Sequence, residues 1–129
     1  MLERFQKDDP LISLEPVANP DQIIHLQQMR KEIRISAPIR NYITDIVAAT
    51  RNAGSLRFGS SPRGSLGLMR ASQGLAALKG RDYVLPDDIK QLVLPVLTHR
   101  IILNEEARLG GEDPEQILTE IISRIPVQQ

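Results

Sequence analysis

The chain has 129 residues, which suits one domain with a modest hydrophobic core. Its sixteen basic and sixteen acidic residues balance to a formal net charge of zero, which argues against a general nucleic-acid binder that works by neutralising phosphates. There is no cysteine, so disulfides, thiolate catalysis and cysteine-based zinc sites are excluded, and two tyrosines, two phenylalanines and no tryptophan make a base-stacking surface unexpected.

The first residues read as a connecting segment because Pro10 and Pro16 interrupt any long helix. A domain that begins in this way is typical of a piece of a longer chain. We therefore assign residues 1–18 to a linker and residues 19–129 to a helical domain. No apolar run is long enough to span a bilayer and the N-terminus lacks the apolar segment of a signal peptide, so we expect a cytoplasmic protein.

Helix start signals recur along the chain, each with a proline at or near the first helical position. Helices are predicted to begin after Asn19, Ser36, Ser61, Leu85 and Asp113. Apolar residues recur at helical spacing behind each start, and we expect them to form the core. They are Ile23, Ile24 and Met29; Ile39, Ile43, Ile46, Val47 and Thr50; Leu66, Leu68, Ala71, Leu75 and Leu78; Ile89, Leu92, Val93 and Val96; and Ile117, Leu118, Ile121, Ile122 and Ile125.

Two details interrupt the helical pattern. Pro95 lies inside the fourth helix, which is expected to kink or restart there because proline removes a backbone N–H. The apolar run that ends at Leu103 could pair with Ile33–Ile35, and residues 104–112, which contain two adjacent glycines, are predicted to form a loop. The fold class is therefore all-α, a bundle of four to five helices with at most a short two-stranded ribbon.

The stretch Gly59–Ser65 places an arginine at the start of the third helix. Ser61 is expected to accept a hydrogen bond from a backbone N–H, and Pro62 gives up no needed donor. Arg63 then lies in the first helical turn, where the helix dipole disfavours a cation. Two interpretations follow: Arg63 reaches a neighbouring carboxylate, or it forms with the helix start an anion site, most naturally for phosphate.

The sequence offers no complete catalytic apparatus. It contains no G-x-x-x-x-G-K-[ST] phosphate loop, and Asp87-Asp88 opens a helix, where acids ordinarily complement the dipole. His25 and His99 are the only histidines, so no metal site is predicted and His25 is interpreted as a surface residue. A self-contained enzyme is therefore not expected.

Three separated blocks resemble the C-terminal lid of the MoxR family of AAA+ ATPases: GSSPR at 59–63, GRDYVLPDD at 80–88 and PVLTHRI at 95–101. Upstream, Asp9-Pro10-Leu11, Glu15-Pro16-Val17 and the segment 42–51 fit the same family in the same order, so the resemblance covers nearly the whole chain. It implies a helical lid that follows an ATPase core, and these residues do not include that core.

The resemblance implies that Arg63 matches the sensor 2 arginine, which makes it our candidate for both the catalytic and the ATP-binding residue. In the family this residue reaches from the lid to the phosphates of ATP, which the core domain holds together with magnesium. Arginine suits this role because its fork of donors and its charge offset the charge on the transferred phosphoryl group. Because the lid moves relative to the core, one such contact also couples the nucleotide state to the domain angle.

The resemblance further implies that the full-length protein is an ATP hydrolase. It would act as a chaperone-like remodelling machine in hexameric rings, maturing partner complexes or inserting their cofactors. Expected partners are the ATPase core domain of the same chain, neighbouring ring subunits and proteins with von Willebrand factor A domains. Nucleic acid and a membrane span are not expected.

Other residues that match family motifs are interpreted as structural. Asp82 is expected to accept from Arg81 or from a neighbouring helix end, and His99 and Arg100 to satisfy carbonyls after the proline break. Arg51 is expected in a structural ion pair, with a contact to a neighbouring subunit as the alternative.

Leu2-Glu3-Arg4-Phe5 resembles the family's Leu-Asp-Arg-Phe, but it stands in the linker, so the arginine-finger role is not assigned to Arg4. Two other functions remain open. A free-standing helical module that binds a protein without nucleotide would use the same helices. A nucleic-acid-binding lid of the clamp-loader kind is disfavoured by the zero net charge.

Overall fold

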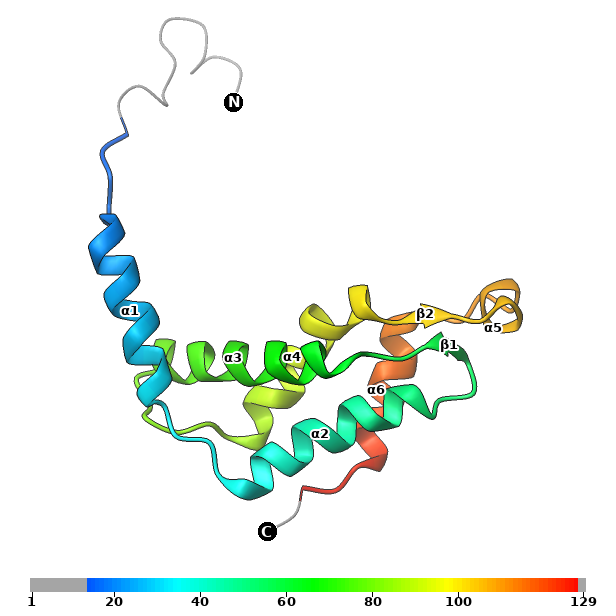
Figure 1. The fold of residues 1–129 in the computed structure, drawn as a ribbon. Helices are drawn as coiled ribbons and strands as arrows, with labels where there is room; N and C mark the ends of the chain where they lie inside the picture. The colour runs from blue at the N-terminus through cyan, green and yellow to red at the C-terminus, as the bar shows by residue number, and fades with distance from the viewer. Residues whose placement is uncertain (1–13, 128–129) are drawn as a thin grey trace, which may run out of the picture.

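The computed structural model describes residues 14–127, which form a helical bundle with a small two-stranded ribbon (Figure 1). Expectations for residues 1–13, including the motif around Arg4 and the Asp9-Pro10-Leu11 block, lie outside the described residues. The all-α class is confirmed. In chain order the elements are α1 (Pro20–Glu32), α2 (Ala37–Arg51), β1 (Leu56–Phe58), α3 (Pro62–Leu78), α4 (Pro86–Leu97), the 3-10 turn η3 (Thr98–Arg100), β2 (Ile102–Leu103), α5 (Glu105–Leu109) and α6 (Pro114–Arg124).

The predicted helix starts are correct, and most are capped by side chains as expected. The side chain of Asn19 accepts from the Gln22 N–H at 2.9 Å, and the Gln22 side chain accepts from the Asn19 N–H at 2.8 Å. This reciprocal capping box satisfies two backbone donors that the helix itself leaves unpaired. The side chain of Asp113 caps the start of α6 in the same sense, accepting from the Glu115 N–H.

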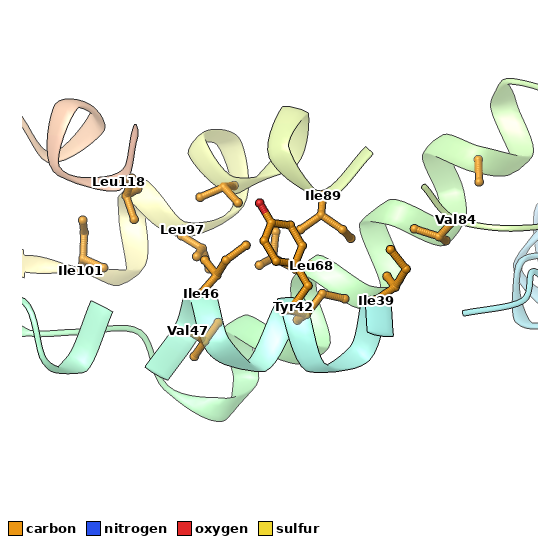
Figure 2. Packing of buried hydrophobic residues seen from close by; sticks show 13 residues of the cluster. Ile39, Tyr42, Ile46, Val47, Leu68, Val84, Ile89, Leu97, Ile101 and Leu118 are labelled. Carbon is orange, nitrogen blue, oxygen red and sulfur yellow. The ribbon is translucent and has the colours of Figure 1, made fainter. Parts of the chain in front are cut away.

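The core lies between α2, α3, α4 and α6 (Figure 2). The predicted inward face of α2 is confirmed, and Tyr42 joins it with 1% of its surface exposed. The Tyr42 hydroxyl has no hydrogen-bond partner within residues 14–127, and burial raises its pKa. The side chains that the other three helices bury against this face include Leu68, Ala76, Ile89, Val93, Leu97 and Leu118.

The ribbon forms between strands other than the pair we predicted. β2 pairs antiparallel with β1, with Leu56 opposite Leu103 and Phe58 opposite Ile102. The sequence did not indicate β1 because three residues inside a glycine- and serine-rich loop are too short to show a strand period. Instead of joining this ribbon, Arg34 forms an isolated parallel bridge with Tyr83.

Three helical expectations also need correction. The segment 104–112 contains the short helix α5, whose cap Asn104 accepts from the Ala107 N–H. α4 continues through Pro95 to Leu97 and only then tightens into η3, so the break comes two residues later than predicted. The Thr98 hydroxyl donates to the Leu94 carbonyl at this point, and that bond helps to satisfy the disrupted end of the helix.

The apolar residues of α1 are not part of the core, contrary to expectation. No residue of α1 is buried, and its apolar side chains are between 46% and 58% exposed. Leu78 at the end of α3 is 88% exposed, and Leu66 near its start is 47% exposed. Helical spacing identifies the apolar face of a helix, but it does not show whether a partner covers that face.

A buried carboxylate joins the end of α3 to the start of α4. The Asp88 side chain is 2% exposed and accepts from the Arg81 guanidinium at 2.7 Å, from Lys79 at 3.1 Å and from the Leu85 N–H at 2.9 Å. Burial alone would raise the pKa of Asp88, but these hydrogen bonds outweigh it and lower the pKa to about 2.

This carboxylate predicts a specific dependence of stability on pH. The pKa of Asp88 lies below its ordinary value of 3.8. The stabilisation from its ionised form is therefore fully present at pH values above about 3.8 and is lost as the pH falls through about 2. The ionised carboxylate contributes about 2 kcal/mol to the free energy of unfolding, because each unit by which the folded-state pKa is lowered is worth about 1.4 kcal/mol. Asp88→Asn should lower the free energy of unfolding near neutral pH and remove this part of its acid dependence.

Urea unfolding at a series of pH values measures the effect. Asp87→Asn is the matched control, because Asp87 is the neighbouring residue but its side chain is 87% exposed and, within residues 14–127, pairs only with Lys90. Equal acid dependence in the wild type and Asp88→Asn would contradict the assignment.

Candidate functional site

Arg63 lies in the first turn of α3 with its side chain exposed to solvent. Within residues 14–127 its guanidinium forms no ion pair and no hydrogen bond, so the alternative in which Arg63 reaches a carboxylate is not realised there. Ser61 is the N-cap as predicted, but its side chain makes no capping hydrogen bond, and the first turn carries no acidic residue. The positive end of α3 is therefore not complemented by a neighbouring side chain of the same turn.

A buried pair of hydroxyl residues fixes the loop that leads to Arg63. The Ser60 N–H donates to the Thr50 hydroxyl at 2.9 Å, and that hydroxyl donates in turn to the Val47 carbonyl at 2.7 Å. Both Thr50 and Ser60 are fully buried. Because a buried polar group is costly unless it is paired, this arrangement holds the loop against the last turn of α2.

Two glycines allow the close packing that this loop requires. A Cβ atom on Gly59 would collide with the backbone of Thr50 and Arg51. A Cβ atom on Gly64 would collide with the Ser60 side chain and would lie 3.1 Å from Leu97 Cδ2 on α4. The start of α3 is thus packed against α2 on one side and α4 on the other, and Arg63 projects from a fixed point.

The structure assigns different partners to the charged residues around the third helix. Arg81 pairs with Asp88 and also donates to the Tyr83 carbonyl at 2.9 Å, so the first of the two alternatives for Asp82, a hydrogen bond from Arg81, is not realised. Asp82 pairs instead with Arg34 at 2.8 Å, with both side chains largely exposed. Arg81 and Asp82 both form ion pairs, as the structural interpretation predicts, and the exposed Arg34–Asp82 pair contributes little to stability.

Arg100 satisfies a carbonyl after the proline break, as predicted, because its Nε donates to the Val96 carbonyl at 3.0 Å. His99 is exposed and makes no hydrogen bond with the described part of the chain, so the same expectation fails for it there. Arg51 is also exposed, and the ion pair expected for it is not formed within residues 14–127. His25 lies on the surface of α1, as predicted.

Sequence reasoning missed two polar positions that hold the scaffold. The first is Ser60, whose N–H donates to Thr50; the signal for it was a threonine on the apolar face of α2, because a buried hydroxyl needs a hydrogen-bond partner. Gln73 is nearly buried on α3, donates to the Ile33 carbonyl at 2.9 Å and accepts from Arg30 at 3.0 Å. It ties the end of α1 to α3, and a glutamine within a helix gives no sequence signal of this role.

Residues 14–127 contain neither a metal-binding cluster nor a membrane-spanning helix. No group of three or more acidic or histidine side chains is arranged to hold a metal ion there. In the same residues, no helix has the length and hydropathy that crossing a membrane requires.

Comparison with known proteins identifies the family of this fold. A family model described as the AAA lid domain matches residues 48–121, which run from the end of α2 into α6 and include the whole Arg63 loop. The chain belongs to the AAA lid domain family. Its resemblance to the lid of MoxR-family AAA+ ATPases is likewise confirmed by relatives in both sequence and structure.

The lid is 43% identical over 131 residues to protein YeaC of Bacillus subtilis, a match that covers all of this chain and 41% of YeaC. It is 29% identical over 122 residues to the chaperone MoxR1 of Mycobacterium tuberculosis, covering 88% of this chain and 32% of MoxR1. A solved structure of an ATPase candidate from Cytophaga hutchinsonii superposes with a TM-score of 0.91 at 28% identity, covering 99% of this chain and 42% of that one. The lid therefore spans about two fifths or less of the length of these relatives.

The close approach at Gly59 predicts that the loop cannot accept a side chain. Gly59→Ala must displace the loop or the end of α2, and we expect it to lower the free energy of unfolding by about 1–3 kcal/mol. Gly54→Ala in the same connection is the control, because a Cβ there meets no atom within 4 Å and Gly54 has no positive φ; its effect should stay within about 0.5 kcal/mol. Urea unfolding of both variants tests this, and two equally stable proteins would show that the loop is not constrained.

Proposed function

We propose that this lid serves a MoxR-like AAA+ ATPase and that Arg63 is its sensor 2 arginine, which contacts the phosphates of ATP held by the ATPase domain. The observation that carries the proposal is the state of Arg63: exposed, on a fixed helix start, and without a carboxylate partner in the described part of the chain. A cation at the positive end of a helix is unfavourable when no counter-ion is present. A bound phosphate would neutralise both the guanidinium and the partial positive charge of the helix N-terminus.

The described residues can supply one contact to a triphosphate, through Arg63, and do not form a complete nucleotide site. Arg63 supplies a planar fork of donors that can hold two phosphate oxygens at once. The remaining phosphate contacts and the magnesium ligands would come from the ATPase domain, to which residues 1–18 would be the connection. Bound ATP supplies the phosphoryl group whose developing charge Arg63 would stabilise.

The same contact would transmit the nucleotide state to the position of the lid. The start of α3 is packed against α2 and α4. A change in the position of Arg63 would therefore displace the three helices together and would not be absorbed by the loop before α3. We propose that this movement couples ATP binding and hydrolysis to chaperone-like remodelling of partner complexes by a hexameric ring, with proteins that carry von Willebrand factor A domains among the partners. The name of the relative MoxR1, a chaperone, supports the remodelling role.

Replacing Arg63 in the full-length ATPase tests the proposal. Arg63→Ala should reduce ATP hydrolysis by roughly ten-fold to a thousand-fold, the range expected for a donor that acts on developing phosphoryl charge. Arg63→Lys keeps the charge but not the planar fork, so we expect an intermediate rate. Steady-state phosphate release measures both variants.

Arg124→Ala is the matched control. Arg124 is an exposed arginine on α6 that pairs with Glu120, and its removal should leave the hydrolysis rate unchanged. A rate for Arg63→Ala equal to that of Arg124→Ala would sink the sensor 2 assignment and favour a helical interaction module that binds no nucleotide.

A further inference from the structure

The helix α1 leaves its apolar side chains uncovered. It stands away from the bundle and meets it at the C-terminal end of α3 (Figure 1). None of its 13 residues is buried. An isolated helix of this length is marginal in water, and helices in proteins are normally stabilised by burying an apolar face. The exposed side chains of α1 therefore indicate a surface that another part of a larger assembly covers.

These side chains line a groove of about 370 Å³ between α1 and the end of α3, which we call the α1–α3 groove. Ile23, Leu26 and Met29 form its α1 wall, and Gly74, Ala77 and Leu78 form its α3 wall. The residues at 74 and 77 are small, so a docked side chain can approach the backbone of α3 closely. The groove is predominantly apolar and suits apolar side chains better than a charged ligand.

The α1–α3 groove continues the surface that carries Arg63. Positions 63, 70, 74 and 77 of α3 are separated by seven, four and three residues, and at about 3.6 residues per turn they fall on one stripe of the helix. The stripe runs for about 21 Å, since each residue advances the helix by about 1.5 Å. One folded domain that contacts Arg63 is large enough to reach the groove at the other end of the same stripe.

The length of the relatives identifies an occupant. α1 is included in the superposition on the Cytophaga hutchinsonii structure, which covers 99% of this chain but only 42% of that one. More than half of that longer chain is thus available to cover the groove. A domain of the same chain is also favoured over a separate protein, because a tether gives it an effective concentration of about a millimolar or more.

We propose that the α1–α3 groove is a docking site for apolar side chains of the ATPase domain of the same chain. This inference rests on the proposed function, since it takes that domain as the occupant. Docking at the groove would then hold one end of α3 against the ATPase domain, while the Arg63 contact at the other end of α3 changes with the nucleotide state.

Photo-cross-linking in the full-length ATPase tests the proposal. Benzoylphenylalanine is placed at Leu26 in the groove, or at Leu109 on α5, which is 85% exposed and lies outside the groove, as the matched control. After irradiation the products are separated by mass and the linked peptides are identified by mass spectrometry. We expect position 26 to give a product of single-chain mass whose linked peptide belongs to the ATPase domain, in several-fold higher yield than position 109.

Every other result overturns the proposal. A product of twice the chain mass would show that a neighbouring subunit or a second copy occupies the groove, and a yield no higher than at position 109 would show that the groove is open. The same cross-link is measured in Arg63→Ala together with ATP hydrolysis. Normal hydrolysis in Arg63→Ala with an intact cross-link would remove the sensor role and leave the docking site, whereas impaired hydrolysis in Arg63→Ala together with no cross-link in the wild-type ATPase would remove the docking site alone.

Discussion

The hydrogen bond from the Ser60 N–H to the buried Thr50 hydroxyl is the constraint on which the candidate site depends. It fixes the loop after β1 against the last turn of α2, and Gly59 and Gly64 permit the close backbone contacts that follow from it. Arg63 comes directly after this anchored segment. Ordering a long arginine side chain on a ligand costs conformational entropy. Because the helix start is already fixed, the backbone adds little to that cost when Arg63 binds a phosphate.

The helix α3 is held at both ends, and this makes it suited to transmit force. At its start it packs against α2 and α4, and beyond its end Lys79 and Arg81 pair with the buried Asp88 of α4. The carboxylate is stabilised as an anion because its partners outweigh the cost of burial. We therefore propose that a displacement at Arg63 moves the bundle as a whole.

Much of this architecture could be predicted from local sequence. Proline after a capping residue marked the starts of α1, α2, α3 and α6 correctly, and the period of apolar residues gave the buried face of α2. The errors have a common cause, which is that tertiary partners leave no local signal. β1 is too short to show a period, and the helical spacing of the apolar residues in α1 and at Leu78 does not show whether another element covers them. The position of Arg63 in the first turn of α3 could be predicted because a helix start is encoded locally, whereas the contacts of Gln73 depend on residues some forty positions away.

We propose that Arg63 carries the nucleotide state from the ATPase domain into the lid. A structure of the full-length ATPase with a non-hydrolysable ATP analogue tests it most directly. We expect the Arg63 guanidinium to lie about 3 Å from a phosphate oxygen of the nucleotide held by the same chain. An Arg63 side chain that points into solvent, or that pairs with a carboxylate while other residues hold the phosphates, would contradict it.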